Sequence, residues 1–228
     1  MHLYLIRHGQ SENNALEESL RVKDPGLTEA GLTQVDYLGK WFSVRPLDVL
    51  ITSPFRRALL TTVPIAKATG LTPIVRTAIH EVGGCVSGYP AIGYQGESGM
   101  ARMEIQKAFP GFEPEPDIDE RGWWKSKPYE SKEARILRAQ EVVQQIVAQY
   151  AETDLHVALV MHADFKHTLL QHFLPDLPMD AEHFGALRNA GISTLKITNG
   201  SVILENFNCI QHMPAVIITP ASHSETRI

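Results

Sequence analysis

The sequence contains very little cysteine. Among its 228 residues only Cys85 and Cys209 carry thiols, and they form no CxxC pair or other metal-binding spacing. So low a number argues against a disulfide framework and is typical of proteins from a reducing compartment. We therefore expect a fold that is stabilised by a hydrophobic core.

Long apolar runs and a recognisable targeting segment are also missing. No run approaches the length of a membrane span. The first residues, MHLYLIRHG, turn polar too soon for a signal peptide. We therefore predict a cytoplasmic protein that has no membrane partner.

Basic residues are not in excess. The chain has 21 Lys and Arg against 26 Asp and Glu, and its formal net charge is −5. General nucleic-acid binding usually needs a basic face, so we expect no nucleic-acid partner, although a local group of arginines remains compatible with this balance. Hydrophobic residues make up 43% and charged residues 21%, as in ordinary globular proteins.

Strands and helices alternate along most of the chain. The pattern predicts strands at 2–7, 47–53 and 156–161, helices at 27–42, 54–70, 131–150 and 164–173, and a hairpin over 192–207. Within the second helix, Pro64 is expected to cause a bend or a break. Such alternation predicts an α/β fold with three layers, in which helices cover a mostly parallel central sheet.

Residues 83–129 interrupt this alternation. They are rich in glycine and proline and are predicted to form an insertion of loops and short helices that acts as a lid, with one helix near residues 100–109. Trp123 and Trp124 are interpreted as core residues or, for one of them, as a lid residue over the substrate. We expect a single domain over 1–215 and a C-terminal tail over 216–228.

Charged and titratable side chains follow the predicted strands. Ligands of parallel sheets bind beyond the carboxyl ends of the strands, so residues at these ends are expected to converge on one crevice. The residues concerned are Arg7, His8, Arg56, Arg57, Glu81 and His162.

This combination of side chains suits phosphoryl chemistry. Guanidinium groups match phosphate oxygens in bidentate fashion and remain charged at any working pH. A neutral imidazole carries a lone pair that can attack phosphorus. A protonated carboxyl group can donate a proton to the departing oxygen. The sequence therefore indicates a phosphoryl-transfer site at this edge of the sheet.

Four segments of the chain resemble the signatures of the histidine phosphatase superfamily, the phosphoglycerate mutase-like proteins. They are LIRHGQSENN, SPFRRALLTT, HEVGG and VMHADF, and they occur in the family's order and spacing. The resemblance extends from the first strand to about Phe207. It implies the three-layer fold of that family.

The resemblance also implies roles for individual residues. His8 would be the nucleophile that forms a phosphohistidine, and Glu81 the proton donor. The remaining predicted catalytic residues, which would bind the transferring phosphoryl group, are Arg7, Arg57 and His162. Predicted substrate-binding residues are Asn14, Gly9, Ser11 and Arg56, although Arg56 is equally consistent with an exposed charge. No metal or organic cofactor is implied.

Two departures from the family pattern leave alternatives open. The second histidine is usually followed by glycine in this family, whereas here Ala163 and Asp164 follow His162. In one branch of the family the acid closely follows this histidine, so Asp164 rivals Glu81. The mutases' characteristic R-[FY]-x-G-W segment is missing, which favours a phosphatase acting on a small phosphorylated metabolite. Phosphoglycerate mutase-type transfer and a non-catalytic phosphate-binding module are the alternatives. Arg21 is interpreted as a surface charge or ion-pair partner, with contact to a distal part of the substrate as the other possibility.

Overall fold

The computed structural model describes residues 1–177 and 184–220, so residues 221–228 of the predicted tail lie outside it. Its main sheet has seven strands in the order β6-β3-β2-β7-β1-β8-β9. The strands from β6 to β1 run parallel, whereas β8 and β9 pair antiparallel. The strands are β1 His2–Arg7, β2 Val49–Thr52, β3 Ile74–Val75, β6 Glu113–Pro114, β7 His156–Met161, β8 Ile192–Thr198 and β9 Ser201–Cys209.

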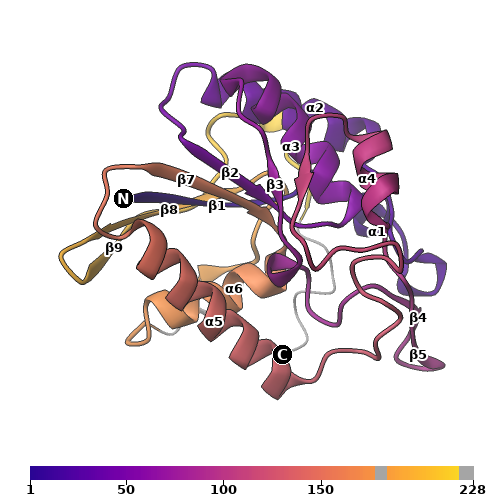
Figure 1. The fold of residues 1–228 in the computed structure, drawn as a ribbon. Helices are drawn as coiled ribbons and strands as arrows, with labels where there is room; N and C mark the ends of the chain where they lie inside the picture. The colour runs from indigo at the N-terminus through magenta and orange to yellow at the C-terminus, as the bar shows by residue number, and fades with distance from the viewer. Residues whose placement is uncertain (178–183, 221–228) are drawn as a thin grey trace.

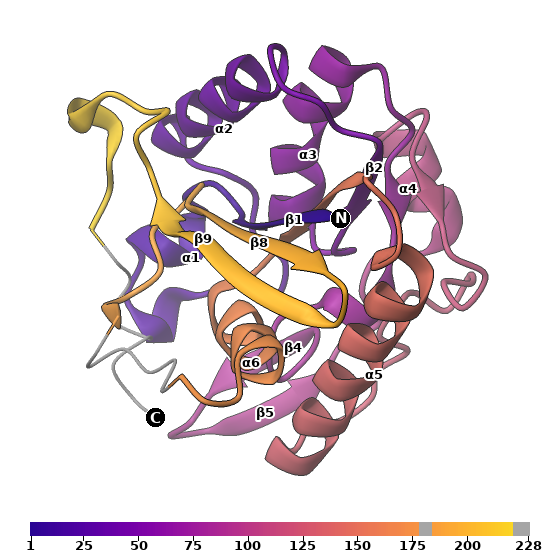
Figure 2. The same cartoon turned by 90° about the vertical axis from the view of Figure 1, so that its left-hand side faces the viewer.

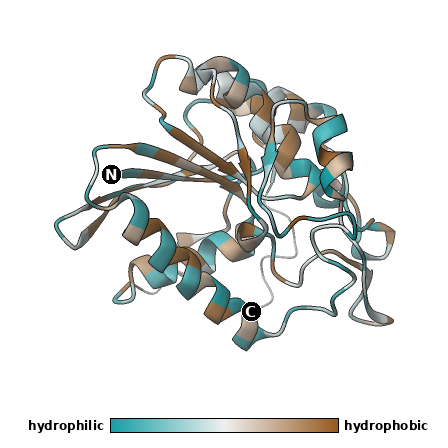
Figure 3. Ribbon diagram, viewed as in Figure 1, coloured by the Kyte–Doolittle hydropathy of each residue, from teal (hydrophilic) through white to brown (hydrophobic). Residues whose placement is uncertain are grey.

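Helices cover both faces of this sheet, as Figures 1 and 2 show. One face packs against α2 Glu29–Phe42 and α3 Arg56–Thr69, and the other against α5 Lys132–Tyr150 and α6 Ala163–Phe173. The strands between the two layers are strongly hydrophobic (Figure 3). The predicted three-layer α/β architecture is confirmed. None of the helices within the described ranges is long and apolar enough to cross a membrane.

Capping residues set the boundaries of α2 and α3. The side chain of Thr28 accepts a hydrogen bond from the Gly31 amide, 3.0 Å away, and thereby caps α2. Helix α3 ends at Gly70, whose φ of 71° lies in the left-handed region. The expected break at Pro64 does not occur, because α3 continues to Thr69. A Cβ on Gly39 of α2 would lie 2.9 Å from the Pro64 carbonyl oxygen, so α2 packs tightly against α3 at this point.

Helix α5 buries one apolar face against the sheet. Val142 is buried, whereas Val147 is 38% exposed. The buried face consists of residues spaced by three or four positions, as a helical period of 3.6 requires. These residues are Ala139, Val142, Ile146 and Tyr150.

The insertion over 83–129 is tied to the main sheet. It contains the hairpin of β4 Val86–Tyr89 and β5 Gly93–Gly96, followed by α4 Arg102–Ala108, and its strand β6 pairs with β3. Trp123 and Trp124 are 1% and 5% exposed and belong to a separate hydrophobic cluster. Both are therefore core residues, and the expectation that one of them covers the substrate is wrong.

The parallel register brings the carboxyl ends of three strands to one edge. Arg7 of β1 pairs with Met161 of β7, and Thr52 of β2 pairs with Val160 of β7. The residues that follow these strands therefore lie close together. His8 and His162 are brought within contact in this way, because their ring centroids are 5.1 Å apart.

A lysine lies in the interior between α6 and the sheet. Lys166 is fully buried, and its Nζ donates a hydrogen bond to the Gly191 carbonyl oxygen, 3.0 Å away. Burial, with a smaller contribution from the Arg7 charge, lowers the pKa of Lys166 to about 7. The unfolded chain, in which the pKa of a lysine is near 10.5, binds more protons than the folded chain between pH 7 and pH 10.5. Stability should therefore rise with pH in that window.

Replacing this lysine by an apolar residue should remove that dependence. We expect Lys166→Met to raise the free energy of unfolding at pH 7. This gain should be roughly 3 kcal/mol larger at pH 7 than at pH 10, because a neutral lysine carries no desolvation cost of a buried charge. Urea unfolding of both proteins at several pH values would measure this difference. Lys196→Met, in which the lost ammonium is exposed, is the control. A gain that did not change with pH would contradict the prediction.

Candidate active site

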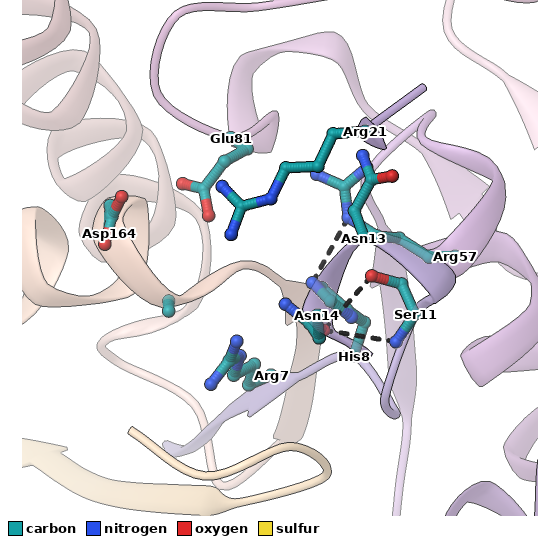
Figure 4. A pocket seen from close by; sticks show the side chains of 10 residues that line it. Arg7, His8, Ser11, Asn13, Asn14, Arg21, Arg57, Glu81 and Asp164 are labelled. Carbon is teal, nitrogen blue, oxygen red and sulfur yellow. Dashed lines mark hydrogen bonds between the residues drawn. The ribbon is translucent and has the colours of Figure 1, made fainter. Parts of the chain in front are cut away.

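A pocket of about 190 Å³ opens at this edge of the sheet (Figure 4). Its lining combines positive, amide and carboxyl side chains, and most of them come from segments that follow strands. The lining residues are Arg7, His8, Ser11, Asn13, Asn14, Arg21, Arg57, Glu81, Ala163 and Asp164.

The orientation of the His8 imidazole is fixed by two contacts. Its Nδ1 lies 2.7 Å from the carbonyl oxygen of Gly9, which can only accept a hydrogen bond, so Nδ1 carries the proton. Its Nε2 accepts a hydrogen bond from the Nε of Arg57 at 3.2 Å. Both contacts select the same tautomer. The Nε2 lone pair therefore faces the positive side of the pocket.

The pKa of His8 is lowered well below 6.5. Burial is the largest cause, and the charges of Arg57 and Arg7 act in the same direction. Each of these effects disfavours the imidazolium form. His8 is therefore neutral at physiological pH, and its Nε2 keeps a lone pair.

The two predicted phosphoryl-binding arginines are held by the protein. The guanidinium of Arg57 stacks on the Phe55 ring, 4.1 Å from its centroid. The guanidinium of Arg7 donates a hydrogen bond to the Leu187 carbonyl oxygen. Both groups remain charged inside the fold. Together they give the pocket a positive wall.

His162 is fully buried beside His8 and is not among the residues that line the pocket; hydrogen bonding and aromatic contacts hold its ring. Its Nε2 lies 2.7 Å from the hydroxyl oxygen of Ser53, and its ring contacts Phe55 with centroids 5.1 Å apart. Burial, followed by the Arg57 charge, lowers the pKa of His162 well below 6.5. Its Nδ1 is buried and has no hydrogen-bond partner among residues 1–177 and 184–220.

Asn14 is held with its amide nitrogen available. Its Oδ1 accepts three hydrogen bonds of 3.1 Å, from the backbone amide and the hydroxyl of Ser11 and from the Nδ2 of Asn189. Since the oxygen is saturated, the NH₂ group is left to donate toward the pocket. Ser11 thus acts on the site partly by orienting Asn14. Asn189 is a supporting residue that no sequence signal indicated.

Glu81 is anchored through one carboxyl oxygen. Its Oε1 accepts hydrogen bonds from the backbone amides of Val82 (2.8 Å) and Phe165 (3.0 Å), the latter in the first turn of α6. The second oxygen is left for the pocket, which Glu81 lines together with Asp164 (Figure 4). Both candidate acids are therefore present at one side of the site.

Two predicted substrate-binding residues do not line this pocket. A Cβ on Gly9 would lie 2.7 Å from Cγ1 of Val35 and 2.9 Å from the Gly31 carbonyl oxygen, so Gly9 allows close packing against α2. Arg56 is exposed and lines a second cavity of about 600 Å³. The physical reason is that successive residues at the start of α3 point in different directions, so Arg57 and Arg56 enter different cavities.

Arg21 and Asn13 are lining residues that were not among the predicted site residues. Asn13 lies in the four-residue helix α1, Glu12–Ala15, and Arg21 lies in the irregular segment that follows it, so no periodic pattern could have placed them. Within the described part of the chain, no three His, Cys, Asp or Glu side chains are arranged to hold a metal ion.

The chain matches a known protein family. The sequence profile described as the histidine phosphatase superfamily (branch 1) matches residues 3–210. A curated relative, phosphoserine phosphatase 1 of Hydrogenobacter thermophilus, is 38% identical over 80 residues. That alignment covers 35% of this chain and 38% of the relative.

Solved structures share the fold at low sequence identity. Bacillus stearothermophilus YhfR superimposes with a TM-score of 0.65 at 23% identity, and the match covers 92% of this chain and 98% of that one. A phosphoserine phosphatase mutant from Entamoeba histolytica, in complex with phosphoserine, has a TM-score of 0.63 at 21% identity, with 93% and 99% covered. Mycobacterial glucosyl-3-phosphoglycerate phosphatase has a TM-score of 0.59 at 23% identity, with 91% and 98% covered.

The packing of Gly9 generates a test of how the site is supported. We expect Gly9→Ala to destabilise the protein by about 1–3 kcal/mol, because the added methyl group would overlap the backbone of α2. Thermal and urea unfolding would measure the loss. Gly26→Ala is the matched control, since a Cβ there would approach no atom closer than 3.9 Å. Equal stability of the two variants would show that the contact with α2 is not tight.

Proposed function

The chain belongs to branch 1 of the histidine phosphatase superfamily, and on this premise we propose that it hydrolyses phosphomonoesters through a covalent phosphohistidine at His8. The observation that carries this proposal is the protonation of His8. Its Nδ1 proton is held by the Gly9 carbonyl oxygen, while its Nε2 lone pair faces the arginine-lined pocket. A neutral imidazole in this state is an effective nucleophile toward phosphorus.

In the first step, Nε2 of His8 attacks the phosphorus atom. The N–P bond forms as the bond between phosphorus and the leaving oxygen breaks. Nε2 accepts the Nε–H of Arg57, so during attack Arg57 must give up this bond and donate to a phosphoryl oxygen instead. The exchange places a charged donor beside the phosphoryl group during attack.

The positive wall stabilises the transferring group. Arg7 and Arg57 provide charge-assisted hydrogen bonds to the non-bridging oxygens, and the NH₂ group of Asn14 provides another donor. The Nδ1 of His162, which has no hydrogen-bond partner among the described residues and whose ring centroid lies 5.1 Å from that of His8, supports a further contact with the phosphoryl group. These groups are positioned before the substrate arrives, so they require little reorganisation.

Glu81 is proposed as the acid that protonates the leaving oxygen. The two backbone amides that hold its Oε1 leave Oε2 to carry the proton into the pocket. Asp164 lines the same side of the site and remains the rival acid. Glu81 is favoured because both of its anchoring bonds are directed to one oxygen.

In the second step, water replaces the nitrogen on phosphorus. Glu81, now a carboxylate, takes a proton from the water, the N–P bond breaks, and inorganic phosphate is released. Transfer to water, without isomerisation of the substrate, distinguishes this reaction from that of a mutase. The small volume of the pocket supports a small phosphorylated substrate, and similar proteins include ones named as phosphatases.

Removal of the nucleophile is the direct test. We expect His8→Ala to lower kcat on p-nitrophenyl phosphate by about 1000-fold or more, because no other neutral imidazole lines the pocket among the described residues. The acid-labile, base-stable phosphoprotein that forms during turnover should disappear with it. His172→Ala, at the far end of α6, is the control and should retain both.

A result that would refute the proposal is a wild-type protein that binds phosphate but neither releases phosphate from esters nor becomes phosphorylated. It would instead support a non-catalytic phosphate-binding module.

The role of Glu81 can be separated from that of Asp164 by varying the leaving group. p-Nitrophenolate leaves without a proton, whereas an alkoxide needs one. For Glu81→Gln we therefore expect kcat/KM on glycerol phosphate to fall about 100-fold or more, and kcat/KM on p-nitrophenyl phosphate to fall less than about tenfold.

Asp164→Asn provides the comparison, since it removes the other candidate acid from the same side of the pocket. If Asp164→Asn showed the selective loss and Glu81→Gln did not, the acid would be Asp164.

A further inference from the structure

We propose that Arg21 recognises a second anionic group on the leaving portion of the substrate, so that the substrates are phosphomonoesters carrying a carboxylate or another phosphate. This inference rests on the proposed phosphatase function and names the substrate class of the same site. It is carried by the position of Arg21 and by the lack of a protein partner for its guanidinium.

Arg21 reaches the pocket from outside the phosphoryl-binding wall. It follows a short 3-10 helix, Glu18–Leu20, and its side chain extends across the pocket on the side where Glu81 lies (Figure 4). Glu81 is the proposed donor to the leaving oxygen. A group that lies on the Glu81 side of a bound substrate therefore faces the leaving portion and not the phosphoryl oxygens.

The backbone beside Arg21 is fixed by a reciprocal pair of hydrogen bonds. Asn13 Nδ2 donates to the Val22 carbonyl oxygen at 2.6 Å, and the Val22 amide donates to Asn13 Oδ1 at 3.0 Å. Asn13 belongs to α1, Glu12–Ala15, which also carries Asn14. The segment bearing Arg21 is thus attached to the helix that presents a phosphoryl-binding amide.

The guanidinium of Arg21 has no acceptor in the described part of the protein. Its Nε is shielded from solvent and makes no hydrogen bond, and no carboxylate lies within ion-pair distance. Other arginines are paired with acids, as Arg76 is with Glu115 and Arg138 with Glu130. A shielded donor without an acceptor is costly. An anionic group on the substrate would satisfy it.

The guanidinium of Arg21 is suited to binding a planar or tetrahedral oxyanion. A guanidinium matches carboxylate and phosphate oxygens with two parallel hydrogen bonds. Arg7 and Arg57 already serve the phosphoryl group that is transferred, so Arg21 is not needed for that group. A short chain between the two anionic groups suits a pocket of about 190 Å³.

Two pairs of substrates test this inference. O-phosphoserine and O-phosphoethanolamine differ only in a carboxylate, and ethanediol bisphosphate and ethanediol monophosphate differ only in a second phosphate. kcat/KM would be measured for all four on wild type, Arg21→Met, Arg21→Lys and Arg121→Met. Arg121 is exposed and paired with Asp119 outside the pocket, which makes it the matched control.

We expect wild type and Arg121→Met to prefer the doubly anionic member of at least one pair. In Arg21→Met this preference should fall about 10- to 100-fold, as expected for a lost charge-assisted pair. Arg21→Lys should restore only part of it, because ammonium cannot form the bidentate contact. The pair that responds identifies the group as a carboxylate or a phosphate.

The outcomes distinguish the two proposals. If wild type hydrolysed the substrates but neither preference depended on Arg21, the role of Arg21 would be wrong and the phosphatase function would stand. An equal loss on both members of each pair would likewise refute the role of Arg21 alone. If folded wild type hydrolysed none of the four substrates or p-nitrophenyl phosphate, the phosphatase function would be refuted, and the role of Arg21 with it.

Discussion

The hydrogen bond between His8 Nδ1 and the Gly9 carbonyl oxygen is the contact on which the site depends. It fixes the tautomer and aims Nε2 at Arg57. The bond itself depends on the backbone path after β1, which Gly9 allows to run directly against Val35 and Gly31 of α2. The orientation of His8 Nε2 therefore depends on the packing of Gly9 against α2.

Buried positive charge is the second organising feature. Arg7 and Arg57 lie beside two imidazoles whose pKa values are lowered by burial and by these same charges. The protein offers only partial compensation, since the half-buried Asp24 near Arg57 has its pKa raised to about 6 by its own desolvation. Such an arrangement of positive charge favours the binding of an anion in the pocket. Active sites commonly violate the rules that hold elsewhere in a fold.

Much of this arrangement could be predicted because it follows from strand ends. Parallel register places the residues after β1, β2 and β7 at one edge, and Arg7, His8, Arg57 and His162 were found there. Contact of Arg21 with the substrate was only an alternative interpretation of the sequence, since the placement of Arg21 depends on the hydrogen bonds of Asn13 with Val22. Gly9 and Arg56 do not line the pocket, because motif membership says nothing about the direction in which a residue points. The burial of both tryptophans depended on tertiary packing that no local pattern encodes.

The Phe55 ring contacts both the site and the hydrophobic cluster that contains Trp123. One ring contacts His162, carries the guanidinium of Arg57, and packs against Trp123 at a centroid distance of 4.8 Å. Substitutions at Trp123 would therefore change the surroundings of His162 and Arg57 through this ring. The β4–β5 hairpin contributes no residue to the hydrophobic cluster that contains Trp123. Substitutions in the hairpin therefore leave the packing of Phe55 unchanged.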